Sequence, residues 1–223
     1  MPYDPGRSVS AVRPANHRSP ASEAIGAAPL SIASVTAVLR DLLANGLIRY
    51  SNVTRLGDVH VSVLPPDRIA VGAEEPNQLN LFMYRIAPHP TLTRRALENA
   101  DKSAGPAPAL DLHYLLTAYG AQDLHSEVLL GCAIHLLSTV PFLTPDLVQE
   151  ILEAPSAKGA RSSASPVRTA LATSGLTSSF DRLRVTQQFM PFEDMSKLWS
   201  TLQARYRPSV TYEVSAVPMP VER

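Results

Sequence analysis

The chain has 223 residues, of which 45% are hydrophobic and 18% charged, and its 20 basic and 20 acidic side chains give a formal net charge of +0. This length allows one large domain or two small ones. The neutral balance argues against a dedicated nucleic-acid binder, which normally carries an excess of basic residues. It also leaves little electrostatic self-repulsion, so contacts with other protein chains are tolerated.

The single cysteine, Cys132, excludes an intrachain disulfide and a multi-cysteine zinc site. Its apolar neighbours indicate a small buried residue, and the reducing cytosol is the expected compartment. The N-terminus contains no apolar signal segment, and the longest apolar run, Val128 to Val140, is too short to span a bilayer. We therefore expect a cytoplasmic protein that does not insert into a membrane.

The first ordered element is expected near residue 29. Residues 1–28 are rich in Pro, Ser, Ala and Arg without periodicity, which predicts a disordered tail. The stretch "PLSIASVTAVLRDLLANG" then places its apolar residues at helical spacing. Ser31 is the candidate N-cap of this helix, and Gly46 is the candidate left-handed residue just after its end.

Three segments of the first half show strand patterns. "DVHVSVLPP" alternates through its valines and closes with Pro65 and Pro66, which predicts a short strand. "NQLNLFMYRIAPHP" is apolar on both faces and is typical of a central strand. The polar stretch "TLTRRALENADKSAGPAPA" is expected to connect it to the next strand, "LDLHYLLTAYG".

The second half alternates helices and strands around one long loop. A helix is predicted from Gln122 to Val140, followed by a short helix with Thr144 as its cap and Pro145 at its first position. Residues from about 154 to 176 are expected to form a flexible loop. "DRLRVTQQFM", "FEDMSKLWSTLQ" and "RPSVTYEVSAV" then predict a strand, a helix and a strand.

These elements predict one domain of the α/β (α+β) class over residues 29–218, with a short tail at 219–223. Its mixed sheet should contain about five strands, with helices packed on it.

Motifs for catalysis or cofactor binding are absent from the sequence. It has no Gly-rich phosphate loop, no dinucleotide fingerprint, no H-E-x-x-H and no G-x-S-x-G, so we expect no cofactor and no metal. Asp111 and His113 share one face of a strand and resemble half of a catalytic triad. Because no nucleophile motif accompanies them, a structural strand face is the preferred interpretation. Tyr114 and Tyr119 are expected to be packing residues with one hydroxyl partner each.

Trp199 lies on the apolar stripe of its predicted helix. The preferred interpretation is a core residue. The alternative is an anchor in a contact with another chain, because buried tryptophans often dominate protein interfaces.

Three segments together resemble a known family. They are "NQLNLFMYRIAPHPTLTRR", "LDLHYLLTAYG" and "SKLWSTLQARYRPSVTYEVSAV", with a helix "LHSEVLLGCAIHLL" between the last two. In this order they resemble the tail-terminator or cap proteins of extracellular contractile injection systems, phage-tail-like particles of the antifeeding-prophage type. The resemblance covers about residues 30–218. Residues 1–28 have no counterpart in it, the loop from about 154 to 175 is long and low in complexity, and some relatives continue into an additional domain.

The resemblance implies a tail-terminator-like fold and a structural protein, not an enzyme. Such proteins form a ring of six on the end of the inner tube that lies furthest from the baseplate. There they stop tube growth and hold the last layer of sheath. The implied partners are therefore the chain itself, the inner tube protein and the sheath protein, in a particle that is assembled in the cytoplasm and can be released.

The resemblance also implies how the sheath is held, because sheath subunits in this family are linked by extended arms that complete one another's sheets. A cap must then supply or accept a strand. Pro208–Val217 lies near the chain end and is the best candidate for such an edge strand, with Val210, Tyr212 and Val214 as candidate sheath or ring contacts. The preferred interpretation of this segment is nevertheless an internal strand of the cap's own sheet.

Two other functions remain open from the sequence. One is a transient assembly chaperone or a baseplate component of the same particle, which differs from a cap in copy number and position. The other is a hydrolase using Asp111 and His113, which would need a nucleophile in a sharp turn.

Overall fold

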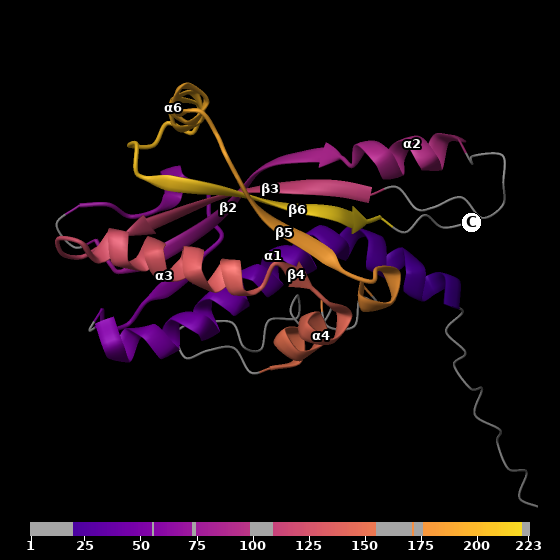
Figure 1. Cartoon of the computed structure of the whole chain (residues 1–223), viewed down its shortest axis with the longest axis horizontal. Helices are drawn as coiled ribbons and strands as arrows, with labels where there is room; N and C mark the ends of the chain where they lie inside the picture. Colours follow the sequence, from indigo (N-terminus) through magenta and orange to yellow (C-terminus); the bar gives the residue numbers. More distant parts are fainter. Residues whose placement is uncertain are drawn as a thin grey trace, which may run out of the picture.

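The computed structural model describes residues 20–54, 56–72, 75–98, 109–154, 171 and 176–219. They form a mixed sheet of six strands in the order β1-β2-β3-β6-β5-β4. Helices α1, α3 and α4 lie on one side of the sheet, and α6 lies on the other (Figure 1). The predicted α+β class is confirmed, with one strand more than expected.

The elements in chain order are α1 (Pro20–Thr54), β1 (His60–Ser62), the 3-10 helix η1 (Pro66–Arg68), β2 (Gln78–Pro88), α2 (Pro90–Glu98), β3 (Ala109–Tyr119), α3 (His125–Thr139), β4 (Phe142–Leu143), α4 (Pro145–Glu153), the 3-10 helix η2 (Leu176–Ser179), β5 (Leu183–Gln188), α6 (Phe192–Thr201) and β6 (Ser209–Pro218). β1 runs parallel to β2, and the other strand pairs are antiparallel.

Helix α1 is longer at both ends than its sequence pattern predicted. It begins at Pro20, within the predicted disordered tail, and continues to Thr54. Ser31 is therefore not an N-cap but a fully buried residue inside the helix. Residues 1–19 of the predicted tail lie outside the described part of the chain, as do residues 155–170 and 172–175 of the predicted loop.

Gly46 has a packing role and does not end α1. A Cβ atom at this position would lie 2.6 Å from the Leu136 side chain of α3. Because glycine has no Cβ, the two helices can approach closely at this point. The predicted left-handed C-terminal glycine is thus wrong, since a glycine near an apolar stripe carries the same sequence signal in both roles.

The remaining differences concern short elements. The connection predicted after β2 contains the helix α2, and the two-residue strand β4 was not predicted because two residues show no periodicity. The helix predicted at Thr144 is confirmed: the Thr144 side chain accepts a hydrogen bond from the Leu147 backbone N–H at 3.4 Å.

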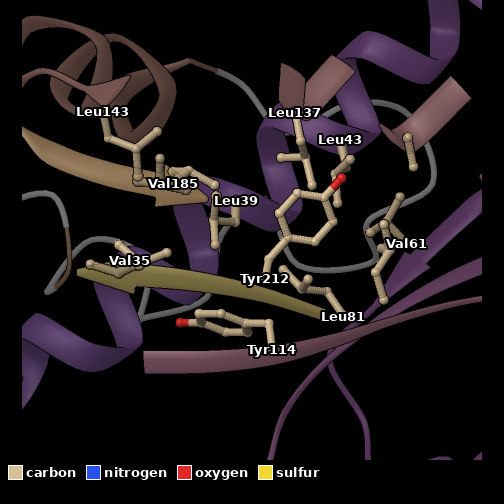
Figure 2. Close-up of a cluster of buried hydrophobic side chains, with 14 of the residues drawn as sticks. Val35, Leu39, Leu43, Val61, Leu81, Tyr114, Leu137, Leu143, Val185 and Tyr212 are labelled. Carbon is tan, nitrogen blue, oxygen red and sulfur yellow. The ribbon is translucent and has the colours of Figure 1, made fainter. Parts of the chain in front are cut away.

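The main hydrophobic core lies between the sheet and the helices α1, α3 and α4. Figure 2 shows Val35, Leu39 and Leu43 of α1 packed around Tyr114 and Tyr212 of the two central strands. The segment of α1 from Leu30 to Tyr50 is long and apolar enough to cross a membrane by composition alone. Its apolar stripe is instead part of this core, which explains the composition.

Three buried tyrosines make the fold sensitive to alkali. Burial raises the pKa of Tyr212 to about 12 and that of Tyr119 to about 12. Burial also raises the pKa of Tyr114, against the lowering effect of its 2.9 Å hydrogen bond with Thr36. A tyrosine whose folded pKa exceeds the unfolded value of about 10 contributes stability that is complete below that value and lost as the pH rises.

We therefore expect cooperative alkaline unfolding above about pH 10, with these tyrosines ionising during the transition. Ultraviolet absorbance of phenolate and circular dichroism, followed against pH, should change together. In Tyr114→Phe the transition should move to higher pH. Phenolate formation completed well before the loss of structure would contradict the assignment.

Candidate interface surfaces

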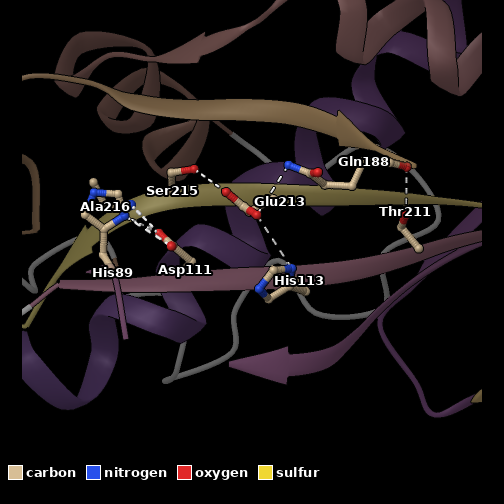
Figure 3. A network of polar contacts seen from close by, with 8 residues as sticks. All are labelled: His89, Asp111, His113, Gln188, Thr211, Glu213, Ser215 and Ala216. Atoms are coloured by element: carbon tan, nitrogen blue, oxygen red, sulfur yellow. Dashed lines mark hydrogen bonds and ion pairs between the residues drawn. The ribbon is translucent and has the colours of Figure 1, made fainter. Parts of the chain in front are cut away.

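The sheet face opposite α1 carries a network of polar side chains. It includes His89 and the side chains of β3, β5 and β6 that alternate with core residues (Figure 3). Leu115, at one end of this face, is covered by α6 and belongs to a second, smaller hydrophobic cluster. The polar half-face predicted for "LDLHYLLTAYG" is therefore present, and α6 covers one end of it.

The side chain of Asp111 stabilises a register shift, or β-bulge, between the two central strands. The β3–β6 register shifts between Leu110 and Leu112, and Ala216 opposite has a left-handed φ of 64°. The backbone N–H of Ala216 donates to Asp111 Oδ1 at 3.0 Å, and His89 Nδ1 lies 2.9 Å from the same oxygen. A buried carboxylate thus satisfies a backbone donor that the regular ladder leaves unpaired.

His113 lies opposite Glu213 on the neighbouring strand, with His113 Nδ1 3.8 Å from Glu213 Oε2. Glu213 also accepts hydrogen bonds from Ser215 Oγ at 2.6 Å and from Gln188 Nε2 at 3.3 Å. Asp111 and His113 are therefore each engaged by other residues of the sheet, which favours the structural interpretation over half of a triad. Among the described residues, no group of three or more His, Cys, Asp or Glu side chains could hold a metal ion.

Replacing the Asp111 carboxylate should destabilise the fold. Asp111→Ala leaves the half-buried Ala216 N–H without its acceptor at the register shift, and such a loss costs about 1–3 kcal/mol. The free energy of unfolding in urea measures it. Asp181→Ala, at an exposed turn, is the matched control and should change stability by less than about 0.5 kcal/mol. Equal effects of the two variants would show that the bulge contact contributes nothing.

The segment Pro208–Val217 forms an internal strand, as the preferred interpretation of its sequence has it. β6 pairs with β3 on one side and with β5 on the other. Tyr212 and Val214 are buried in the main core, and Val210 is partly buried against it. The candidate edge strand at Pro208–Val217 is thus not an edge, because nearness to the chain end does not determine where a strand is inserted into a sheet.

Trp199 is 2% exposed and packs with Leu115 and Met195 between α6 and the sheet. The preferred interpretation, a core residue, is confirmed for this chain. Its ring contacts that of Tyr206, with centroids 6.1 Å apart. Its Nε1 is buried and has no hydrogen-bond partner among the described residues.

Exposed aromatic side chains surround α6. Phe189 is 89% exposed and Phe192 is 72% exposed, and the Phe192 ring contacts that of Tyr206 at 5.8 Å. We call these three residues the α6 surface. Clustered exposed aromatic residues mark contacts with other proteins. The sequence signal is the pair of phenylalanines on either side of Pro191, but the strand pattern of "DRLRVTQQFM" includes Phe189 and hides this signal.

The outer edge of β5 is only partly covered. β4 pairs with Arg184 and Leu183, and Val185 N–H donates to the Pro141 carbonyl at 2.9 Å. Beyond that point, no strand in the described part of the chain pairs with the outer side of β5. A cleft of about 420 Å³ lies along this edge, lined by Leu137, Ser138, Pro141, Phe142, Arg184, Val185, Thr186, Gln187 and Tyr212.

The opposite end of the sheet is β1, which pairs with β2 through only three residues. Val63 and Leu64, just after this strand, are 37% and 44% exposed. Asp58 before the strand and Asp67 after it are also exposed. The two ends of the sheet therefore differ in shape and chemistry.

Comparison with known proteins places the chain in a family. Residues 34–223 match the family described as the Pvc16 N-terminal domain. No curated protein matches the sequence. Among solved structures, the chain is similar to the sheath/tube terminator of the extracellular contractile injection system PVC in its extended state, with 13% identity and a TM-score of 0.43. That similarity covers 79% of this chain and 56% of the terminator, so the chain spans about half of the terminator's length. Because the family match spans most of the sequence, the chain belongs to the Pvc16 N-terminal domain family, and its predicted resemblance to tail-terminator or cap proteins is confirmed.

Proposed function

We propose that this protein is the structural cap of a contractile injection system. Six copies form a ring on the baseplate-distal end of the inner tube, where the ring stops tube growth and anchors the last layer of sheath. The observation that carries the proposal is the family match over residues 34–223. Asp111 accepts a hydrogen bond from the Ala216 backbone and His113 lies beside Glu213, so both side chains have structural partners, which supports a role without catalysis.

A ring requires a contact between two different surfaces of the same chain, since a head-to-tail contact closes by rotation. The near-zero net charge favours such self-association, because neighbouring copies repel each other little. The two unlike ends of the sheet supply two different surfaces.

Sheath retention requires a surface other than the edges of β6, which are paired with β3 and β5. The α6 surface is the candidate. Phe189 and Phe192 are exposed on it, and a second cleft of about 360 Å³ lies beside Phe189, Met190 and Met195. A protruding apolar segment of a sheath subunit would bury these rings, and burying a phenylalanine side chain contributes roughly 1.5–3 kcal/mol.

Electron microscopy of particles with and without this protein tests the role. With it, one end of each tube should carry a density with sixfold symmetry, and the sheath should end level with the tube. Without it, tubes should vary in length and the last sheath layers should be lost. Finished particles that lack the chain would instead indicate an assembly chaperone, and a density at the baseplate would indicate a baseplate component.

Substitutions in the α6 surface test the sheath contact separately. Phe189→Ser together with Phe192→Ser should leave the ring on the tube end while the sheath detaches. Ile48→Ser, at an exposed position of α1, is the control and should leave the sheath in place. Normal sheath retention in the double variant would exclude this surface.

A further inference from the structure

The outer edge of β5 leaves backbone groups without a partner strand. Past Val185 only the inner side of β5 is paired, with β6, while no strand in the described ranges pairs with its outer side. Unpaired strand edges readily pair with another chain. Tyr212 lines the cleft beside this edge, and its hydroxyl is buried without a hydrogen-bond partner among the described residues. Buried polar atoms are nearly always paired, so this hydroxyl indicates that the cleft is incomplete in the single chain.

The side chains at this edge specify what would fit. Arg182 and Arg184 stack on the Phe142 ring, with their guanidinium carbons 4.8 Å and 5.5 Å from its centroid. One carboxylate, that of the exposed Asp181, lies beside them in the sequence. The edge therefore offers apolar walls with an excess of positive charge and favours a segment with apolar and acidic side chains.

The opposite end of the same sheet has those properties. Val63 and Leu64 are partly exposed after β1, and the exposed carboxylates of Asp58 and Asp67 flank the strand, with Arg68 as one neighbouring cation. The apolar side chains at the β1 end match the apolar walls of the cleft at the β5 edge. The excess of acidic side chains at the β1 end likewise matches the excess of basic side chains at the β5 edge. Such complementarity aligns two surfaces and disfavours like-with-like pairing.

We infer that the β1 end of one copy docks against the free edge of β5 in the next copy, which makes this head-to-tail pairing the ring contact. The inference rests on the proposed function and names the surfaces that its ring would use. Because β1 and β5 lie toward opposite ends of one sheet, the contact is heterologous and closes by rotation, and the sheet continues across the subunit boundary.

Cross-linking in assembled particles tests the contact. His60 and Gln187 are both exposed, so a chain with His60→Cys and Gln187→Cys, in a Cys132→Ala background, carries one reactive thiol at each end of the sheet. A short bismaleimide should produce a ladder of cross-linked chains that ends at the hexamer. Each single-cysteine chain should remain monomeric in the gel. Pairing His60→Cys with Lys197→Cys on α6 is the matched control and should give no ladder.

Charge reversal provides a second measurement. Arg182→Glu with Arg184→Glu should reduce the cross-linked fraction at least tenfold, and adding Asp58→Lys with Asp67→Lys should restore it. Melting temperatures identify any loss that comes from misfolding. Dimers from Gln187→Cys alone would overturn the inference in favour of a symmetric contact. A sixfold ring without a ladder would overturn it while the proposed function stands, whereas the absence of any ring at the tube end would overturn the proposed function itself.

Discussion

Val214→Pro is expected to prevent the chain from folding. Val214 is fully buried at the centre of β6 and pairs with Leu112 on one side and Val185 on the other. Proline has no backbone N–H and is not tolerated in central strands. Loss of a ladder hydrogen bond leaves a buried partner unsatisfied, which costs about 1–3 kcal/mol, and the steric clash of the proline ring adds to this cost. That is a large part of the roughly 5–15 kcal/mol that stabilises a typical domain.

The matched control is Val214→Ala, which keeps the N–H and removes only the side chain. It should fold with a loss of roughly 2 kcal/mol, from the buried methyl groups and the cavity that they leave. Soluble yield, far-ultraviolet circular dichroism and the thermal transition measure both variants. A cooperative transition of the proline variant near that of the parent would show that β6 is not a central strand. It would then return Val210, Tyr212 and Val214 to consideration as sheath contacts.

The placement of β6 in the sheet, where the sequence left both an edge and an internal position open, shows what a single sequence determines. Alternation of apolar residues identified the strand itself, because that pattern depends on local burial. The position of the strand depends on its pairing with β3, whose residues lie about a hundred positions earlier in the chain, as in the Tyr114–Tyr212 pair. No local pattern contains that information.

The polar face of the sheet likewise combines a local feature that the sequence predicts with long-range contacts that it cannot predict. The structural interpretation of Asp111 and His113 followed from the sequence, because no nucleophile motif accompanied them. Their partners could not be predicted: Ala216 lies opposite Asp111 only because the strands shift register there, and His89 joins them from the end of β2. Likewise, the short reach of β4 along β5, which leaves the edge open, has no sequence signal.

Trp199→Ala is expected to release α6 from the sheet while the rest of the fold remains. Replacing a buried tryptophan by alanine typically costs about 3–5 kcal/mol. Here the cost should be local, because Trp199 belongs to the small cluster with Leu115 and Met195, which lies across the sheet from the main core. The stability of α6 therefore depends on few contacts, and it should open without unfolding the domain.

Hydrogen exchange measures this directly. In the variant, amides of residues 192–201 should exchange far faster than in the parent, while those of β3 and β6 should stay protected. Trp199→Phe is the control: it retains a buried ring, and it leaves no unpaired partner because Nε1 has none among the described residues. In the parent, fluorescence from this single tryptophan reports the same docking.

The consequence for the particle follows from the proposed sheath contact. Release of α6 displaces Phe192 and the neighbouring rings of the α6 surface, so particles with Trp199→Ala should keep their ring and lose sheath layers, whereas Trp199→Phe should retain both. This pattern would show that Trp199 positions the sheath contact without touching the sheath, because its side chain is buried beneath α6. Loss of protection throughout the sheet in Trp199→Ala would instead show that the two hydrophobic clusters unfold as one unit.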